Sequence, residues 1–285
     1  MGDNWAMSRA DRPCDFDLIT FSSAIADEAS EILRRHYGAP IEQELKADGS
    51  VVTEADREVE RRVRAMIQRY YPGHGVIGEE FAAERTEAEY IWCVDPLDNT
   101  SEFVAGSPNF GFLLALLWRE RIILGVMDMP ITGTRLIGAD GHGTLLNGSQ
   151  VSTRSCAHMC NAMISAGQPT NTNARCDRAI RRLCECCKHV SFGCDCFSYG
   201  LVAAGKVDVA VSYGLDLYDF AALEPILRNA GGSLTDWSGK QARRSSEGAM
   251  LGLGDPQSLA PIVKVLRNEA SLNDGERCDH KAPQP

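Results

Sequence analysis

The sequence lacks an apolar run long enough to cross a membrane as a helix. Its longest run, residues 110–118, is far shorter than the roughly 20 residues that such a helix needs, and we interpret it as a buried strand. The start has the glycine of a myristoylation signal, but Ala6 stands where Ser or Thr is required, and no apolar signal segment follows. We therefore expect a cytoplasmic protein with no membrane partner.

An excess of positive charge is also absent. The chain has 29 Lys and Arg against 39 Asp and Glu, which gives a formal net charge of −10. A field of this sign repels phosphate polymers, so we expect no general nucleic-acid-binding or anionic-membrane surface. A small anionic substrate would need cations held locally at its site.

Repeats, low-complexity tracts and a second C-x-x-C spacing are missing too. A length of 285 residues with 44% hydrophobic residues allows one large domain or two subdomains that share an interface. Eleven cysteines are present, eight of them within residues 156–196, but only Cys184 and Cys187 have the C-x-x-C spacing. This pattern favours free thiols over a structural zinc site.

Two helical patterns begin the chain. Apolar residues recur at helical spacing in residues 18–32, and the pattern ends near Gly38. Thr53 fits the N-cap of a second helix, which stops at Pro72 and Gly73. Strands with tight turns follow, which predicts an antiparallel meander; they cover residues 91–94, 111–118 and 122–129.

The second half of the chain alternates helices with strands, which is typical of layered α/β packing. The expected helices are residues 178–188, 196–204 and 219–230, and the expected strands are 207–211 and 233–237. We predict a flexible N-terminus over 1–14, an α+β subdomain over 15–154, an α/β subdomain over 155–272 and a disordered tail over 273–285.

Carboxylates at the end of one predicted strand are the first chemical signal. An apolar strand ends at Asp95, Pro96 imposes an extended or turn geometry, and Asp98 follows in the turn. Two carboxylates at this spacing can converge on one cation. Because Asp-Pro and Asp-Asn are also common turn formers, this segment alone fits a plain turn equally well.

Three further acidic positions strengthen the metal interpretation. Asp56, Glu79 and Asp219 each stand beside small or apolar residues rather than within a run of charges. Asp56 could still be only a first-turn acid of the second helix, next to its N-cap Thr53.

These segments closely resemble the motifs of the inositol monophosphatase superfamily. The chain has Gly78-Glu79-Glu80, then Asp95 to Thr100, then Tyr218-Asp219 leading to Ala230-Gly231-Gly232, in the family's order. The resemblance covers about residues 15–265. It implies an α-β-α-β-α sandwich of the inositol monophosphatase and fructose bisphosphatase type, a Mg²⁺-dependent phosphatase activity and a homodimer.

The resemblance also implies roles for individual residues. Two to three Mg²⁺ ions would be bound, and the implied ligands are Glu79, Asp95, Asp98, Asp219 and the carbonyl oxygen of Leu97. Oxygen ligands suit this ion. Glu79, Thr100 and Asp56 would orient and deprotonate the attacking water, and Lys46 would lie on a mobile loop that closes the site. Lithium would inhibit by occupying the second metal position.

The substrate is implied to bind at Asn99, Thr100, Asp195 and Asp219. Asn99 stands where the family usually has glycine, and asparagine tolerates the left-handed backbone that this turn requires. Thr100 could instead cap the next helix. A structural interpretation of Thr100 therefore stands beside the functional one.

Asp195 and its surroundings are most similar to the histidinol-phosphatase branch. A carboxylate there suits a cationic ester such as histidinol phosphate, whereas the inositol branch has small residues at this position. Asp195 could equally cap the helix that follows. The expected reaction is hydrolysis of L-histidinol phosphate in histidine biosynthesis, and the alternatives are an inositol monophosphatase and a catalytically weak regulatory homologue.

Overall fold

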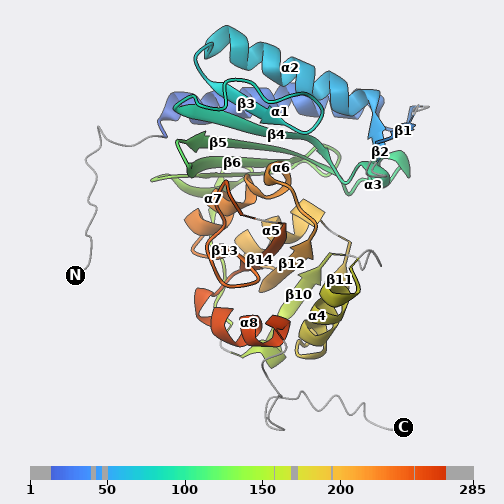
Figure 1. Ribbon diagram of the computed structural model, residues 1–285, viewed down its shortest axis with the longest axis vertical. Helices are drawn as coiled ribbons and strands as arrows, with labels where there is room; N and C mark the ends of the chain where they lie inside the picture. Colours follow the sequence, from blue (N-terminus) through green and yellow to red (C-terminus); the bar gives the residue numbers. More distant parts are fainter. Residues whose placement is uncertain are drawn as a thin grey trace.

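A computed structural model describes residues 14–39, 43–46, 51–156, 158–167, 173–193, 195–246 and 248–267 of the chain. These residues form five layers, helix, sheet, helix, sheet and helix, stacked along the long axis of the molecule (Figure 1). The layered fold predicted from the sequence is confirmed. The predicted flexible start, apart from Cys14, and the predicted tail lie outside the described residues.

The first two layers are a helix pair and a seven-stranded sheet. Helices α1 (Phe16–His36) and α2 (Glu54–Tyr70) cover one face of a sheet with strand order β3-β4-β5-β6-β7-β8-β9. Only β3 and β4 are parallel. The strands are β3 (Gly75–Gly78), β4 (Tyr90–Asp98), β5 (Gly111–Trp118), β6 (Arg121–Met129), β7 (Thr134–Ala139), β8 (Gly143–Leu146) and β9 (Ser149–Val151).

Strand β5 shows why this sheet lies between two helical layers. Successive side chains of a strand point to opposite faces. Phe112 and Leu114 pack with the residues of α1 and α2, while Leu113 and Ala115 pack with the helices of the third layer. A strand that is apolar on both faces is thereby buried on both faces, as the uninterrupted apolar run predicted.

A five-stranded sheet forms the fourth layer, with strand order β11-β10-β12-β14-β13. Helices α5 (Asp195–Ala203), α6 (Leu217–Phe220) and α7 (Leu223–Asn229) lie between the two sheets, and α4 (Ala174–Glu185) and α8 (Leu259–Arg267) cover the outer face. The strands are β10 (Met163–Ala166), β11 (His189–Phe192), β12 (Val209–Tyr213), β13 (Ser233–Asp236) and β14 (Ala249–Leu253).

The single helix predicted over residues 219–230 is wrong, because the structure divides it into α6 and α7. Pro225 lies in the first turn of α7 and has no N–H to donate to the preceding turn. Ala221 and Ala222 keep helical backbone angles across the break. The chain therefore continues in the same direction while the hydrogen-bond ladder is interrupted.

Two glycines bring α7 directly onto the first sheet. A Cβ at Gly138 of β7 would lie 2.5 Å from Ile226 Cα, and one at Gly125 of β6 would overlap the carbonyl oxygen of Ala222. The buried Thr144 hydroxyl donates to Ile226 O at 2.7 Å and holds the same helix. This close approach carries α6, and with it Asp219, to the edge of the first sheet.

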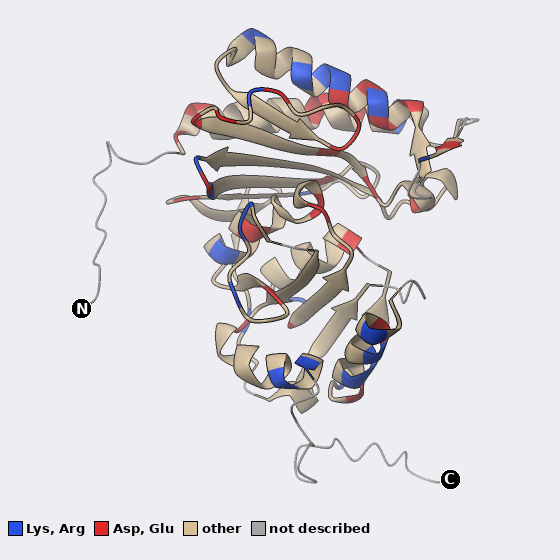
Figure 2. Ribbon diagram, viewed as in Figure 1, with Lys and Arg blue, Asp and Glu red and all other residues tan. Residues whose placement is uncertain are grey.

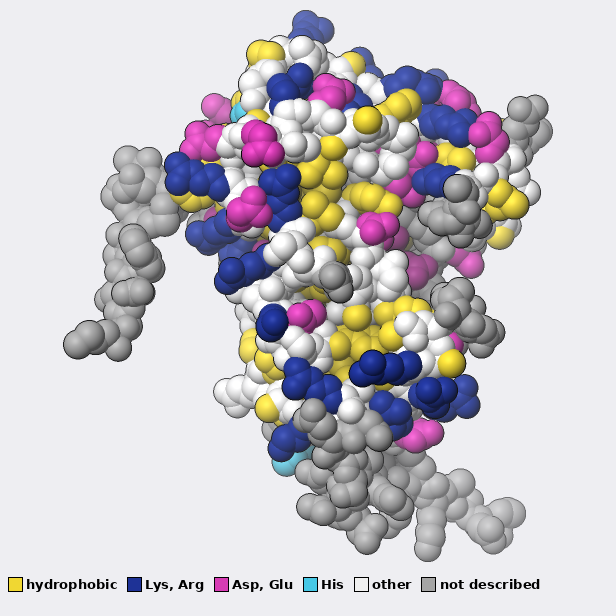
Figure 3. Space-filling model, viewed as in Figure 1, with side chains coloured by type: hydrophobic (Ala, Val, Ile, Leu, Met, Phe, Trp, Pro, Cys, Tyr) yellow, Lys and Arg dark blue, Asp and Glu magenta, His cyan; other side chains and the backbone are white. Residues whose placement is uncertain are grey.

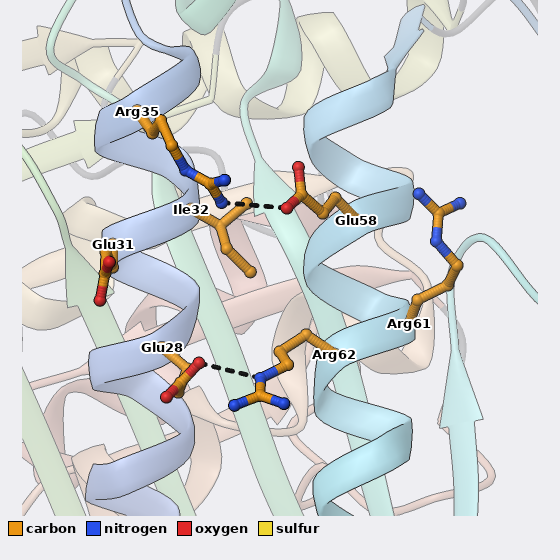
Figure 4. A pocket seen from close by; sticks show the side chains of 7 residues that line it. All are labelled: Glu28, Glu31, Ile32, Arg35, Glu58, Arg61 and Arg62. Atoms are coloured by element: carbon orange, nitrogen blue, oxygen red, sulfur yellow. Dashed lines mark hydrogen bonds and ion pairs between the residues drawn. The ribbon is translucent and has the colours of Figure 1, made fainter.

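Ion pairs join α1 and α2 on the outer surface (Figure 4). Arg35 is 2.9 Å from Glu58, and Arg62 is 2.9 Å from Glu28, while Ile32 lies between the helices. The charged side chains are 34–60% exposed, so solvent screens each pair and it contributes at most about 1 kcal/mol. The apolar residues beneath them hold these helices to the sheet.

The net negative charge comes from the first half of the chain. Residues 1–154 contain 25 acidic and 15 basic side chains, whereas residues 155–285 contain 14 of each. Lys and Arg predominate on α4 and α8 at the lower end of the molecule (Figure 2), and both signs intermingle over the upper part (Figure 3). Attraction of an anion to the acidic half therefore needs a local cation.

The short hairpin that precedes α2 completes the fold. It is formed by β1 (Gln43–Leu45) and β2 (Val51–Thr53), and it contributes Lys46.

Cys156, Cys176 and Cys184 are free thiols. No helix in the described ranges is long and apolar enough to span a membrane.

The glycine contacts predict a large and local stability effect. Gly125→Ala should lower the free energy of unfolding by about 2 kcal/mol, because the added methyl group overlaps the backbone of the third layer. Urea unfolding followed by circular dichroism measures this change. Gly73→Ala is the matched control, since a Cβ there meets nothing within 4 Å and should change stability by no more than about 0.5 kcal/mol. Equal effects of the two substitutions would contradict the packing account.

Candidate functional site

The end of β4 forms the floor of the candidate site. Its pairing with β5 shifts register between Asp95 and Asp98, so the strand bulges there. Asp95 is buried, and its Oδ1 accepts the Leu97 N–H at 3.0 Å. Asp98 Oδ2 accepts the Cys196 N–H of α5 at 3.1 Å. The strand end thus presents two carboxyl groups and binds to the third layer.

Glu79 follows β3, which lies parallel to β4, so both strands end at the same edge of the sheet. Glu60 of α2, which is fully buried, holds this segment from behind. Its Oε2 accepts the Glu80 N–H at 2.7 Å and its Oε1 accepts Arg64 Nε at 2.8 Å. A Cβ at Gly78 would overlap the Glu60 carboxyl group, so a larger residue there would have to displace that carboxyl group.

Lys46 reaches the same edge from the β1–β2 hairpin. Its Nζ lies 2.7 Å from Glu79 Oε1 and 2.5 Å from Glu80 Oε1. Burial opposes its charge, but the two carboxylates outweigh burial and raise the pKa of Lys46. The rest of the predicted mobile loop, residues 47–50, lies outside the described residues.

Asp56 is buried and uses its two oxygens differently. Oδ2 accepts the Thr53 N–H at 2.8 Å and the Thr53 hydroxyl at 2.6 Å, which forms the capping box of α2. Oδ1 accepts the Thr100 hydroxyl at 3.3 Å. The helix-cap interpretation and the predicted contact with Thr100 are therefore both present in the structure.

Asn99 and Thr100 form the turn into the short helix α3 (Thr100–Val104). Asn99 has the left-handed conformation, with φ 68° and ψ 48°, as expected for a position where glycine is usual. Its Nδ2 donates to Asn109 O at 2.9 Å. The alternative that Thr100 caps α3 is wrong, because Asn99 is the N-cap and the Thr100 hydroxyl is 3.0 Å from Leu97 O.

Asp219 comes to this edge from the second half of the chain. It lies in α6, and its Oδ2 accepts the Asp216 N–H at 2.7 Å in a capping box. Asp216 in turn accepts the Tyr218 hydroxyl at 2.9 Å. The contact of α7 with β6 and β7 fixes where α6 lies, so the position of Asp219 depends on both halves.

The carboxyl groups of the site raise one another's pKa values. Burial raises the pKa of Asp95 well above its usual range, and Glu79, Asp98 and Asp219 raise it further. Burial also raises the pKa of Asp219 well above its usual range, and the charges of Asp98 and Glu79 raise it further. Burial also raises the pKa values of Asp98 and Glu79. Four acids from three segments thus form one electrostatic unit, in which negative charges repel one another and are not fully offset by the described cations.

The ligand chemistry of these oxygen atoms suits a hard divalent cation. Carboxylate and carbonyl oxygens are the ligands that Mg²⁺ prefers, and a divalent ion would offset the mutual repulsion. Among the residues that the structure describes, no three His, Cys, Asp or Glu side chains are close enough together to enclose an ion. Within the same part of the chain, Lys46 supplies the one positive charge that contacts Glu79.

Asp195 lies beside this unit at the start of α5. It has a positive φ of 35°, and burial with the charges of Asp98 and Glu102 raises the pKa of its carboxyl group to about 7. Its carboxyl group accepts no hydrogen bond from any residue within the described ranges. The helix-cap alternative for Asp195 therefore has no hydrogen bond to support it there.

Sequence reasoning missed two residues that shape this site. Glu60 was not identified from the sequence. Its position beside Val59 and three residues before Val63 nevertheless places it next to the apolar face of the second helix. Asn109 precedes a buried strand and carried no signal. Both act through contacts between segments far apart in the sequence.

Comparisons with known proteins agree with this arrangement. A model of the inositol monophosphatase family matches residues 17–268. A protein named bifunctional phosphatase IMPL2, chloroplastic, of Arabidopsis thaliana is 38% identical and covers 80% of this chain and 67% of its own length. A histidinol-phosphatase of Mycobacterium tuberculosis is 35% identical over 78% of this chain and 88% of its own. The solved structure of an inositol monophosphatase from Zymomonas mobilis has a TM-score of 0.81 at 34% identity, over 88% of this chain and 98% of that one.

The repulsion within the site predicts an unusual stabilising substitution. Asp219→Asn should raise the melting temperature in excess chelator by roughly 2–4 °C, because removing one charge relieves about 1 kcal/mol of repulsion. Differential scanning calorimetry at neutral pH measures it. Asp17→Asn, which changes an exposed aspartate at the start of α1, should give no increase. A lower melting temperature for Asp219→Asn would show that its cap bond outweighs the repulsion.

Proposed function

The chain belongs to the inositol monophosphatase family, and from this premise we propose that it is a Mg²⁺-dependent phosphomonoesterase that converts L-histidinol phosphate to L-histidinol and phosphate. As a member of that family it is a phosphoric monoester hydrolase. The observation that carries the proposal is the unit of four carboxyl groups at the end of β4, with Asp195 beside it.

Glu79, Asp95, Asp98, Asp219 and the carbonyl of Leu97 would hold two to three Mg²⁺ ions. When bound, these ions would supply charge to draw a phosphate dianion, polarise its oxygens, lower the pKa of a water and stabilise the leaving alkoxide. Lys46 would move away from Glu79 as ions enter, because its ammonium group now contacts one of that residue's oxygens.

Thr100 and Asp56 would orient the attacking water. The single hydroxyl hydrogen of Thr100 can be donated to either Asp56 Oδ1 or Leu97 O, and the hydroxyl oxygen can accept a hydrogen bond from water. Glu79 would accept the water proton as the oxygen attacks phosphorus. The bond from phosphorus to the ester oxygen then breaks, and the alcohol takes up a proton as it leaves. Asn99 and Thr100 would lie against the phosphate.

Asp195 would recognise the cationic part of the ester. Its carboxyl group is partly buried and has no hydrogen-bond donor within the described ranges, so an ammonium or imidazolium group of the substrate would be a charge-assisted partner. Similarity to a named histidinol-phosphatase supports this choice, and the carboxyl group of Asp195, rather than sequence identity, favours it over a neutral polyol phosphate.

Metal dependence gives the first test. Activity on histidinol phosphate should disappear in excess chelator, return with Mg²⁺ and fall with lithium. Glu79→Gln or Asp98→Asn should reduce kcat at least about 100-fold with an unchanged circular dichroism spectrum, because charge at the site rather than packing is lost. Glu87→Gln, on the exposed loop before β4, serves as the control and should behave as the unmodified enzyme. Full turnover in chelator would overturn the mechanism.

Substrate choice gives the second test. Asp195→Ala should lower kcat/KM for histidinol phosphate by on the order of tenfold, which matches one charge-assisted hydrogen bond of about 1.5–3 kcal/mol. Hydrolysis of myo-inositol 1-phosphate by the same variant should change little, because the metal-binding carboxylates remain. If the unmodified enzyme prefers the inositol ester, the substrate assignment fails and the metal mechanism stands.

A further inference from the structure

We propose that Asn109 is a positioning residue for substrate recognition, which fixes the segment carrying Asp195 against the turn carrying Asp98. The proposal rests on the proposed function, because it concerns the group that would recognise the alcohol part of the ester. Asn109 lies just before β5 in the first half of the chain, whereas Asp195 begins α5 in the second half.

A chain of side-chain amides joins the two halves at this point. Asn99 Nδ2 donates to Asn109 O at 2.9 Å, and Asn109 Nδ2 donates to Gly193 O at 2.7 Å. Asn109 itself is held at its own N–H by the Ser107 hydroxyl at 3.3 Å. The turn that would hold the phosphate is thereby linked through one residue to the backbone two positions before Asp195.

The segment that Asn109 holds has a backbone that needs support. Gly193 has a φ of 76°, which only glycine adopts at little cost, and Asp195 has a φ of 35°. A non-glycine residue in this region is strained by about 1–3 kcal/mol and keeps its conformation only when its surroundings impose it. The contacts that impose it here include Asn109 to Gly193 O, Gly193 N–H to Ala166 O at 3.3 Å, and Cys196 N–H to Asp98 Oδ2.

Asn99 fits the same arrangement. Its side chain turns toward Asn109 rather than remaining unpartnered, so an asparagine at this left-handed position contributes a hydrogen bond that a glycine could not. The position that departs from the family pattern is therefore the first link of the connection to Asp195. The two asparagine side chains donate to backbone carbonyl oxygens, so truncating either one removes no described hydrogen bond from Glu79, Asp95, Asp98 or Asp219.

The test compares Asn109→Ala with Asn147→Ala. Asn147 is the control for the hydrogen bond, because its Nδ2 also donates to a glycine carbonyl, Gly133 O, at 2.9 Å. It lies in the turn between β8 and β9, away from the site. Asn109→Asp is a second variant that keeps the shape of the side chain and replaces the donor by an acceptor.

Both Asn109 variants should raise KM for histidinol phosphate about five- to tenfold with kcat within twofold, and change KM for myo-inositol 1-phosphate by less than twofold. Asn147→Ala should change neither. Parallel losses of kcat on both esters, or the same loss in Asn147→Ala, would overturn the positioning role.

Hydrogen–deuterium exchange tests the connection without any substrate. The peptide that carries Gly193 and Asp195 should exchange at least about threefold faster in Asn109→Ala and Asn109→Asp, and at the unmodified rate in Asn147→Ala. This result stands even if the preferred ester is not histidinol phosphate, so failure of the proposed substrate and failure of the positioning role are distinguishable. Unchanged exchange in both Asn109 variants would overturn the inference.

Discussion

Mutual repulsion among buried carboxyl groups is the constraint on which the rest of this structure depends. Asp95 is buried at the end of β4, and the acids of Glu79, Asp98 and Asp219 all raise its pKa. Holding such charges together costs free energy in the folded state unless cations offset them. Favourable packing in other parts of the fold must therefore offset the free-energy cost of bringing the acids together. Their assembly at a place where burial opposes it indicates a functional site, because nothing in the packing requires acids there.

That packing comes from apolar and glycine contacts far from the charges. Gly125 and Gly138 let α7 lie against the backbone of the first sheet, and the buried Thr144 hydroxyl fastens it. Glu60 fixes the Glu79 segment from inside α2. The positions of the acids thus depend on packing contacts that the acids themselves do not make. On the proposed mechanism, a metal ion would replace Lys46 at Glu79 without a change in the fold.

The sequence predicts the layered fold and the two opening helices well, because apolar periodicity and the cap at Thr53 are local signals. The prediction of one helix over residues 219–230 is wrong, because the apolar periodicity continues through Pro225 whereas the helical hydrogen bonds are interrupted there. The acids could be found because each stands in a recognisable local motif. Asn109 could not, since its partners are Asn99 and Gly193 and only the folded chain brings them together. Local chemistry can be recognised in a sequence, whereas the contacts that support it are mostly tertiary.

The structural role of Asp56 is compatible with the catalytic role that we propose for it. Its Oδ2 caps α2 through Thr53, and its Oδ1 accepts the Thr100 hydroxyl. The cap fixes the carboxyl plane, so the second oxygen is presented to Thr100 in one orientation. Asp219 follows the same pattern, since its Oδ2 accepts the Asp216 N–H. A helix cap at each of these acids orients a charged group that solvent would otherwise leave mobile. Preorganisation of this kind is what a site for phosphoryl transfer requires, because its catalysis consists mostly of positioning and electrostatics.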